Sequence, residues 1–184
     1  MRALGVAHLG LGANPVAALT DSLGLWALRL LLLTLTLTPL RYLTGLADWI
    51  RLRRMLGLFA FFYATLHLAM YFLVDQRFAI KVLVEDVTKR PWITLGVVAY
   101  SILLVLALTS NARAMRALGR AWQTLHYAVY AAAAGACWHY YWQVKRDVTA
   151  PLAYAAVFAL LMALRAWRIA RRRSKPFLQA QPSA

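Results

Sequence analysis

The stretch MLGLFAFFYATLHLAMYFLV, residues 55–74, holds twenty residues and no Asp, Glu, Lys or Arg. A helix of about 20 apolar residues is long enough to cross the hydrocarbon of a bilayer. His67 lies inside this stretch, and an imidazole within a bilayer is costly unless it finds a partner. The stretch therefore predicts a membrane helix that carries a functional histidine.

Four further stretches of the chain are long and apolar enough to cross a membrane, and they are residues 22–40, 91–109, 121–142 and 151–169. Only 15% of the 184 residues are charged, whereas a soluble domain has about a quarter. The loops between the stretches are short, which favours antiparallel packing of neighbouring helices. We therefore predict an all-α, polytopic transmembrane helix bundle of about five spans.

The bundle is expected to occupy residues 22–170. Residues 1–21 are too short and too rich in glycine for a span. This N-terminal segment is expected on the outer side of the membrane, opposite the cytoplasm. Residues 171–184 are basic at their start and are predicted to form a cytoplasmic tail.

The loops of the predicted bundle differ in charge on the two sides of the membrane. One side collects 13 Lys and Arg against a single acid, Asp48. These cations are Arg41, Arg51, Arg53, Arg54, Arg113, Arg116, Arg120, Arg165, Arg168, Arg171, Arg172, Arg173 and Lys175. Cytoplasmic loops carry an excess of Lys and Arg, so this side is predicted to be cytoplasmic, with spans 55–74 and 121–142 running outward. Contact with membrane lipid explains the net charge of +15 better than nucleic-acid binding does.

Three of the four histidines, His67, His126 and His139, lie inside the spans, and none of the six acidic residues lies mid-span. An interhelical hydrogen bond is the alternative role of such a histidine, but three imidazoles without acids favour axial ligation of haem iron. The single cysteine, Cys137, leaves no CxxCH attachment motif. The sequence therefore predicts non-covalent, b-type haem.

His67 and His139 are expected at similar depth in the outer half of the membrane. Each lies beyond the middle of its span, 55–74 or 121–142, and both spans run outward. We predict that they are the opposite ligands of one haem. His126 precedes His139 by 13 residues, about 20 Å along a helix, and is predicted to serve a second haem or to act as an alternative ligand.

The spacing of His126 and His139 raises a question about the shape of their helix. At about 100° per residue, 13 steps do not return to one helix face. Either the span is distorted, with Gly135 the obvious place, or His126 and His139 face different neighbours.

The arginines of the inner side are candidates for binding an anionic group. Arg54, about 20 Å inward of His67 along the same predicted helix, is the candidate for contact with a haem propionate, a flavin phosphate or a quinone headgroup. Guanidinium groups bind such anions bidentately. Membrane orientation alone is the alternative explanation of the arginine cluster.

Six short motifs are found together in the chain: TPL at 38–40, RRMLGL at 53–58, ATLHL at 64–68, RPWITLG at 90–96, LGRAWQTLHY at 118–127 and HYYW at 139–142. In combination they resemble the MsrQ (YedZ) family of haem-binding membrane subunits, within the ferric reductase-like transmembrane superfamily. The resemblance runs from about residue 12 to residue 167.

The resemblance implies a transmembrane electron-transfer subunit of the bacterial inner membrane. Such a subunit takes electrons from the quinone pool or a flavin reductase and passes them through one or two haems b to a periplasmic molybdopterin methionine sulfoxide reductase of the MsrP type. It is not catalytic on methionine sulfoxide alone. By position, His67, His126 and His139 match the family's haem histidines, and FMN is an associated cofactor. The family typically has six spans, with one more helix before residues 22–40.

Two other functions stay open at this point. The chain is compatible with another cytochrome b or ferric reductase-type subunit, although it has no GxGxxG nucleotide segment and would need electrons from another protein. A haem-free membrane transporter or assembly protein is disfavoured, because the spans carry no acids and no Gly/Pro-broken segments.

Overall fold

The computed structural model describes residues 14–46, 48–75, 80–144 and 147–174, and within these ranges every regular element is a helix. The elements are α1 (Pro15–Thr44), α2 (Trp49–Met70), η2 (Tyr71–Asp75), α3 (Ile80–Lys89), α4 (Pro91–Leu108), α5 (Ala112–Leu118), α6 (Arg120–His126), α7 (Ala128–Gln143) and α8 (Thr149–Ser174). The turn η2 is π-helical and continues α2. The all-α prediction is confirmed.

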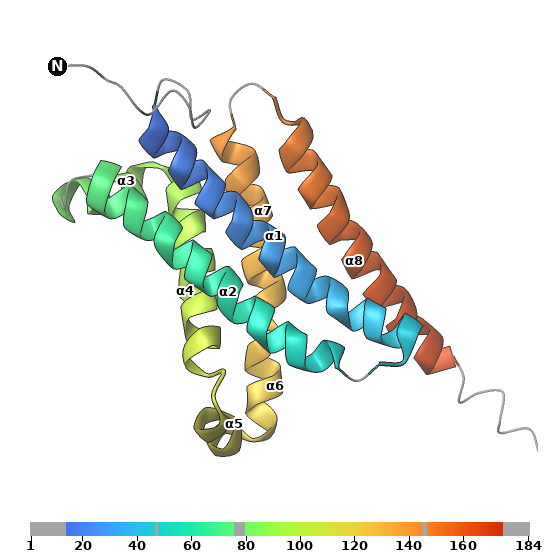
Figure 1. The fold of residues 1–184 in the computed structure, drawn as a ribbon. Coiled ribbons are helices and arrows are strands. Elements are labelled where there is room, and N and C mark those ends of the chain that lie inside the picture. Colours follow the sequence, from blue (N-terminus) through green and yellow to red (C-terminus); the bar gives the residue numbers. More distant parts are fainter. Residues whose placement is uncertain (1–13, 47, 76–79, 145–146, 175–184) are drawn as a thin grey trace, which may run out of the picture.

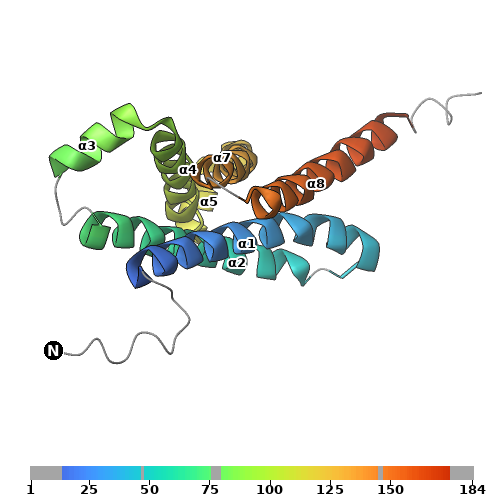
Figure 2. The same ribbon diagram turned by 90° about the horizontal axis from the view of Figure 1, so that it is seen from above.

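The helices are arranged as two antiparallel pairs with one helix beside them. α1 packs most extensively on α2, and α4 packs most extensively on α7. Figures 1 and 2 show that the first pair crosses the second at an oblique angle, and α8 lies against α1 and α7. As a result, α1, α4 and α8 begin at one end of the bundle, and α2 and α7 finish there.

Four stretches of helix are long and apolar enough to cross a membrane: Pro15–Thr44, Arg51–Val74, Pro91–Leu108 and Thr149–Arg171. They correspond to four of the five predicted spans. The remaining span, 121–142, is divided into α6 and α7 at Tyr127. Neither piece is long enough by itself, but the two follow one another along the bundle (Figure 1) and together cover the predicted length.

The first helix begins earlier than the predicted start at residue 22. The Asn14 side chain accepts a hydrogen bond of 3.2 Å from the backbone N–H of Ala17, and Pro15 stands at the first helical position. Both features favour a helix start. The expected domain boundary after residue 21 therefore falls inside α1, and residues 1–13 of that N-terminal segment lie outside the described residues. At the other end α8 continues to Ser174, so the first residues of the expected tail are helical.

Two helices lie in loops for which no helix was predicted. α5 begins at an Asn111 cap, whose side chain accepts from the N–H of Ala114 at 2.9 Å, and it ends at Gly119 with φ 50°. α3 packs against α4 and carries Asp86, which is only 6% exposed. α3 therefore brings an acidic side chain from the loop 75–90 to the bundle.

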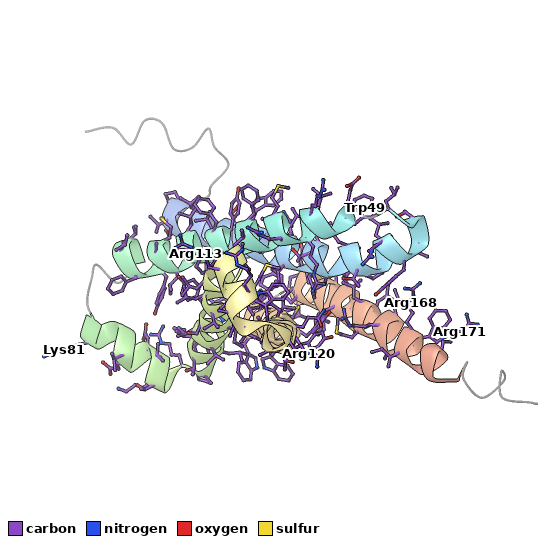
Figure 3. All side chains as sticks on the ribbon, turned by 90° about the horizontal axis from the view of Figure 1, so that it is seen from below. Trp49, Lys81, Arg113, Arg120, Arg168 and Arg171 are labelled. Carbon is purple, nitrogen blue, oxygen red and sulfur yellow. The ribbon has the colours of Figure 1, made fainter. Side chains whose placement is uncertain are left out.

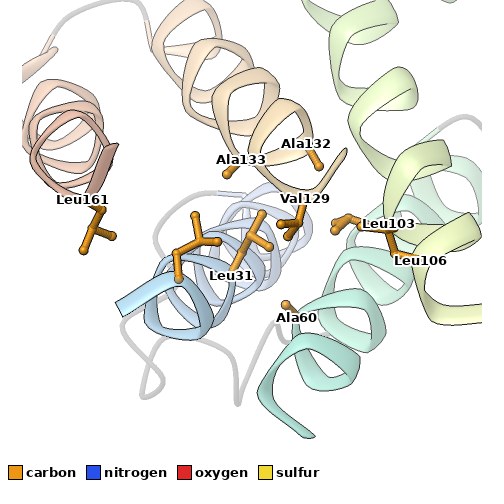
Figure 4. Close-up of a cluster of buried hydrophobic side chains, with 9 residues drawn as sticks. Leu31, Ala60, Leu103, Leu106, Val129, Ala132, Ala133 and Leu161 are labelled. Atoms are coloured by element: carbon orange, nitrogen blue, oxygen red, sulfur yellow. The ribbon is translucent and has the colours of Figure 1, made fainter. Parts of the chain in front are cut away.

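The hydrophobic core lies where the two helix pairs meet α8. It consists of Leu31, Leu35, Ala60, Leu103, Leu106, Val129, Ala132, Ala133 and Leu161, and Figure 4 shows this cluster. Its three alanines are fully buried. Small residues at such contacts let helix backbones approach closely in a membrane, where packing and not the hydrophobic effect holds helices together.

The two ends of the bundle differ in charge. Figure 3 views the bundle from the end at which α5 lies, and Arg113, Arg120, Arg168 and Arg171 are labelled there on α5, α6 and α8. Lys81 belongs to α3, which lies at the opposite end. The structure thus gathers arginines of α5, α6 and α8, which are far apart in the sequence, at one end, called the basic end below.

Candidate functional site

The structure brings His67 and His139 together although they are far apart in the sequence. His67 comes from the last turn of α2 and His139 from α7. The ring centroids lie 6.3 Å apart and the ring planes stand at 78° to each other. Each helix pair therefore contributes one imidazole to the same place.

The hydrogen bonds of these two rings define their tautomers. The His67 Nδ1 lies 2.8 Å from the Thr20 carbonyl oxygen on α1, and the His139 Nδ1 lies 2.7 Å from the Trp92 carbonyl oxygen on α4. A carbonyl oxygen only accepts, so each neutral ring donates its Nδ1–H and keeps the lone pair on Nε2. Histidines that bind metals through Nε2 are commonly held in this way by a backbone carbonyl.

The distance between the two ring centroids agrees with the distance expected for two imidazoles bound to one metal ion. A bond between a metal and an imidazole nitrogen is about 2.0 Å, and that nitrogen lies about 1.1 Å from the ring centre. Two imidazoles on opposite faces of one ion therefore have centroids about 6 Å apart. The observed 6.3 Å agrees with this value.

The number of protein ligands favours a porphyrin over a free metal ion. Across the ranges that the structure describes, no group of three or more His, Cys, Asp and Glu side chains is placed to hold a metal. A free ion such as zinc takes three or four protein ligands. A porphyrin supplies the equatorial ligands itself, so two axial imidazoles are sufficient.

A cavity of about 760 Å³ opens between α1, α2, α4 and α7, and both rings line it. Sites for small molecules and cofactors have volumes of about 300–1,000 Å³. The lining is largely apolar, from residues such as Leu28 and Leu68, with Asp21 and Gln143 among its polar members. The residues present thus fit a mostly apolar group that also carries polar substituents.

A buried acid orients the basic residue of this cavity. The Tyr71 hydroxyl donates to Asp86 Oδ2 at 2.5 Å, and the Arg90 Nε lies 3.1 Å from Asp86 Oδ1. Tyr71 and Arg90 both line the cavity, and Arg90 is the one cation among its described lining residues. Arg90 lies directly before the predicted span 91–109, and no role was predicted for it. The sequence feature that could have pointed to Arg90 is its position at the start of the RPWITLG motif, directly before α4.

His126 does not reach this cavity. Its Nδ1 lies 3.1 Å from the Trp122 carbonyl oxygen, and its ring stacks on the Trp122 ring with the centroids 3.9 Å apart. Its Nε2 lies 3.4 Å from Oγ of Ser110, two residues after the end of α4. His126 and His139 therefore face different neighbours, which was one of the two alternatives. A second haem at His126 stays a prediction.

The predicted span 121–142 is distorted, as one alternative expected, but the prediction that the distortion lies at Gly135 was wrong. α7 is continuous through Gly135, and the helix is interrupted at Tyr127. The His126 ring donates to the Trp122 carbonyl, which is the acceptor that the His126 backbone N–H uses in a regular helix. Such a side-chain bond competes with the helical ladder. The N–H of Tyr127 is in turn shared between the carbonyls of Gln123 and Thr124, both at 3.2 Å.

Arg54 lies on α2 close to the basic end, where its side chain is exposed. It is separated from His67 by about 20 Å along the helix, and it is not among the residues that line the cavity. The structure therefore places Arg54 apart from the His67–His139 pair.

These features define a class: a multi-span helical membrane protein in which two helix pairs each present one imidazole to a common cavity. A family model described as "Ferric reductase like transmembrane component" matches residues 23–137. No solved structure matches the chain.

Curated relatives narrow the class further, and each is named "Protein-methionine-sulfoxide reductase heme-binding subunit MsrQ". The protein of Xanthomonas oryzae pv. oryzae is 48% identical over 175 residues, which are 95% of this chain and 80% of the relative. That of Xanthomonas axonopodis pv. citri is 50% identical over 158 residues, or 86% of this chain and 72% of the relative. That of Brucella ovis is 45% identical over 177 residues, which are 95% of this chain and 79% of the relative. The chain belongs to the MsrQ family, as its motifs predicted.

Proposed function

We propose that this chain binds b-type haem between His67 and His139 and carries electrons through the membrane for a protein-methionine-sulfoxide reductase. The observation that carries the proposal is the pair of imidazoles whose ring centroids lie 6.3 Å apart, with both Nδ1 atoms bonded to backbone carbonyls. The names of the relatives, which call them heme-binding subunits, support it.

The residues around the cavity have distinct tasks in this proposal. Bound haem supplies a centre that accepts and releases one electron at a time. His67 and His139 would hold the iron through Nε2, while the carbonyls of Thr20 and Trp92 keep the rings oriented and increase their basicity as ligands. Arg90, held by Asp86, is the group at the cavity that would bind a propionate carboxylate.

The position of the cavity supports a direction of electron flow. His67 lies in the last turn of α2 and Trp92 in the first turn of α4, so the cavity is near the end of the bundle opposite the basic end. By the positive-inside rule we assign the basic end and the C-terminal tail to the cytoplasm. The haem would then lie toward the periplasmic face of a bacterial inner membrane, where it can serve a periplasmic acceptor.

The acceptor in this proposal is a separate periplasmic molybdopterin subunit. Reduction of methionine sulfoxide to the thioether takes two electrons and two protons and releases one water. The partner performs that step, and this chain delivers the electrons singly. We propose the quinone pool or a flavin reductase as donor, with FMN as a further cofactor from the family resemblance. Arg54 and His126 are the candidates for the donor side, for an anionic headgroup and a second haem respectively.

Electron delivery tests this function directly. Membranes containing the chain and an exported molybdopterin methionine sulfoxide reductase would be supplied with a reduced quinone, and loss of peptide methionine sulfoxide would be followed. Wild type is expected to support turnover and His139→Ala to abolish it. A reduced dye that bypasses the membrane subunit should drive the partner equally in both preparations, which controls for the amount of partner.

Three outcomes would contradict the proposal and separate its alternatives. Equal turnover with His139→Ala would show that electrons do not pass through the His67–His139 site. Wild type that reduces ferric chelates but not the partner would favour the ferric reductase-type subunit. A wild type that stays colourless after haem supplementation would favour the haem-free transporter or assembly protein.

A further inference from the structure

Two glycines touch the rings of the proposed haem ligands. A Cβ added at Gly24 of α1 would stand 2.9 Å from His67 Nδ1, and a Cβ added at Gly96 of α4 would stand 2.9 Å from both Nδ1 and Cε1 of His139. Side chains essentially never approach this closely. At each glycine the three nearest atoms all belong to the imidazole ring.

The same helices supply the carbonyls that hold these rings, in the same register. Thr20, whose carbonyl accepts from His67, is four residues before Gly24; Trp92, whose carbonyl accepts from His139, is four residues before Gly96. A Cβ on a helix tilts toward the N-terminus, so a side chain at the fourth residue projects back over the turn that bears that carbonyl. At these two positions a Cβ on the fourth residue would therefore force the ring away from its place at the carbonyl.

This arrangement is repeated in the two helix pairs. The histidine follows the carbonyl residue at the same sequence separation, 47, in both pairs, and the glycine follows the carbonyl residue by four positions in both. The core continues the match: Leu31 and Leu103 follow Gly24 and Gly96 by seven residues, and both are core residues. The same contact between a glycine and an imidazole ring thus occurs twice, independently. This repetition indicates that each glycine is needed for the placement of the ring.

Close helix packing is the ordinary reason for glycine in a membrane helix. Two other glycines of this chain, Gly135 and Gly57, show the contacts that such packing makes. A Cβ at Gly135 would meet Ala99 Cβ at 3.5 Å and Leu95 Cδ1 at 3.7 Å, and one at Gly57 would meet only Thr34 Cγ2, at 3.8 Å. Those are normal van der Waals contacts with aliphatic groups. Gly24 and Gly96 differ because they meet a ring that the proposed function assigns to iron.

We propose that Gly24 and Gly96 are positioning residues for the axial ligands: their missing side chains let each ring reach its carbonyl, and this sets the ring's tilt and rotation at the iron. The inference rests on the proposed function. It assigns ligand geometry to two residues on α1 and α4, helices that carry no ligand themselves.

The test compares Gly24→Ala and Gly96→Ala with the matched controls Gly57→Ala and Gly135→Ala in the purified, haem-loaded protein. Two quantities are measured: the electron paramagnetic resonance spectrum of the ferric form, which depends on the orientation of the axial ring planes, and the rate of haem loss to apomyoglobin. Each site variant is expected to shift the low-spin signal and to lose haem about 10-fold faster, the scale seen when outer-shell partners of metal ligands are removed. Both controls are expected to match wild type.

A second set of variants separates ring positioning from folding. Free imidazole should restore low-spin haem to His139→Gly, and equally to the double variant His139→Gly/Gly96→Ala, because an untethered ring can move away from the added methyl group. Site variants whose signal and haem loss equal those of wild type would overturn the inference, as would a double variant that imidazole fails to restore. Wild type without a low-spin bis-histidine signal would instead overturn the proposed function.

Discussion

His67 and His139 lie with their ring centroids 6.3 Å apart, and each is bonded through Nδ1 to a backbone carbonyl that precedes it by 47 residues. Neither ring depends on the other helix pair for its orientation. His67 is held by α1 and His139 by α4, so the relative position of the two pairs sets the distance between the rings. The core around Ala60, Ala132 and Leu31, where the two pairs pack together, therefore helps to set the distance between the two rings.

His126→Ala is expected to retain the haem held by His67 and His139, because His126 contacts Trp122 and Ser110 and does not line the cavity. The measurement is the ferric electron paramagnetic resonance spectrum with the haem content of the purified protein. The signal assigned to the two opposed imidazoles should keep its position. Its disappearance in His126→Ala would show that His126 is a ligand of the same iron.

Arg90→Ala is expected to weaken haem binding without changing the low-spin spectrum, because it removes the one cation of the described cavity lining but no axial ligand. The Arg90 side chain is 52% exposed, so the loss should be about 1 kcal/mol, roughly fivefold in the dissociation constant. Haem titration of the apoprotein measures it. Arg54→Ala is the control, and an equal loss in that variant would contradict the assignment of Arg90.

Ala133→Leu is expected to destabilise the bundle, because Ala133 is fully buried between the helix pairs. Overpacking of a well-packed core costs typically about 1–3 kcal/mol. The apoprotein in detergent should melt at a lower temperature than wild type. Ala153→Leu, on an exposed position of α8, provides the comparison and should melt as wild type does. Equal melting of both variants would show that the packing in Figure 4 does not support the fold.

The spans were predictable because the thickness of the bilayer imposes a length that apolar composition reveals directly. The similar depth of His67 and His139 followed from the rise of a helix and the direction of each span. The start of α1 was missed because the apolar run begins later than the Asn14 cap and Pro15, which are local signals. α3 is an amphipathic helix in the connection between two predicted spans, and a search for long apolar stretches does not detect such a helix.

The other features depend on side-chain contacts that a search for apolar spans does not detect. Next to the break at Tyr127, the His126 ring bonds to the Trp122 carbonyl of its own helix, a side-chain contact that hydrophobic periodicity does not indicate. Arg90 and Gly96 belong to a motif quoted for resemblance. Asp86 precedes Arg90 by four residues, the spacing of neighbours on a helix, so their ion pair is readable from the sequence once α3 is recognised as a helix. The role of Gly96 appears only when α7 lays His139 against α4.

The most direct test of a haem held by two imidazoles is the absorbance spectrum of the purified protein, oxidised and dithionite-reduced, for wild type, His67→Ala and His139→Ala. Wild type should show low-spin b-type bands, and each single variant should lose them, since either substitution leaves the iron with at most one of its two axial imidazoles. A variant that keeps the wild-type low-spin spectrum would contradict the pairing of His67 with His139.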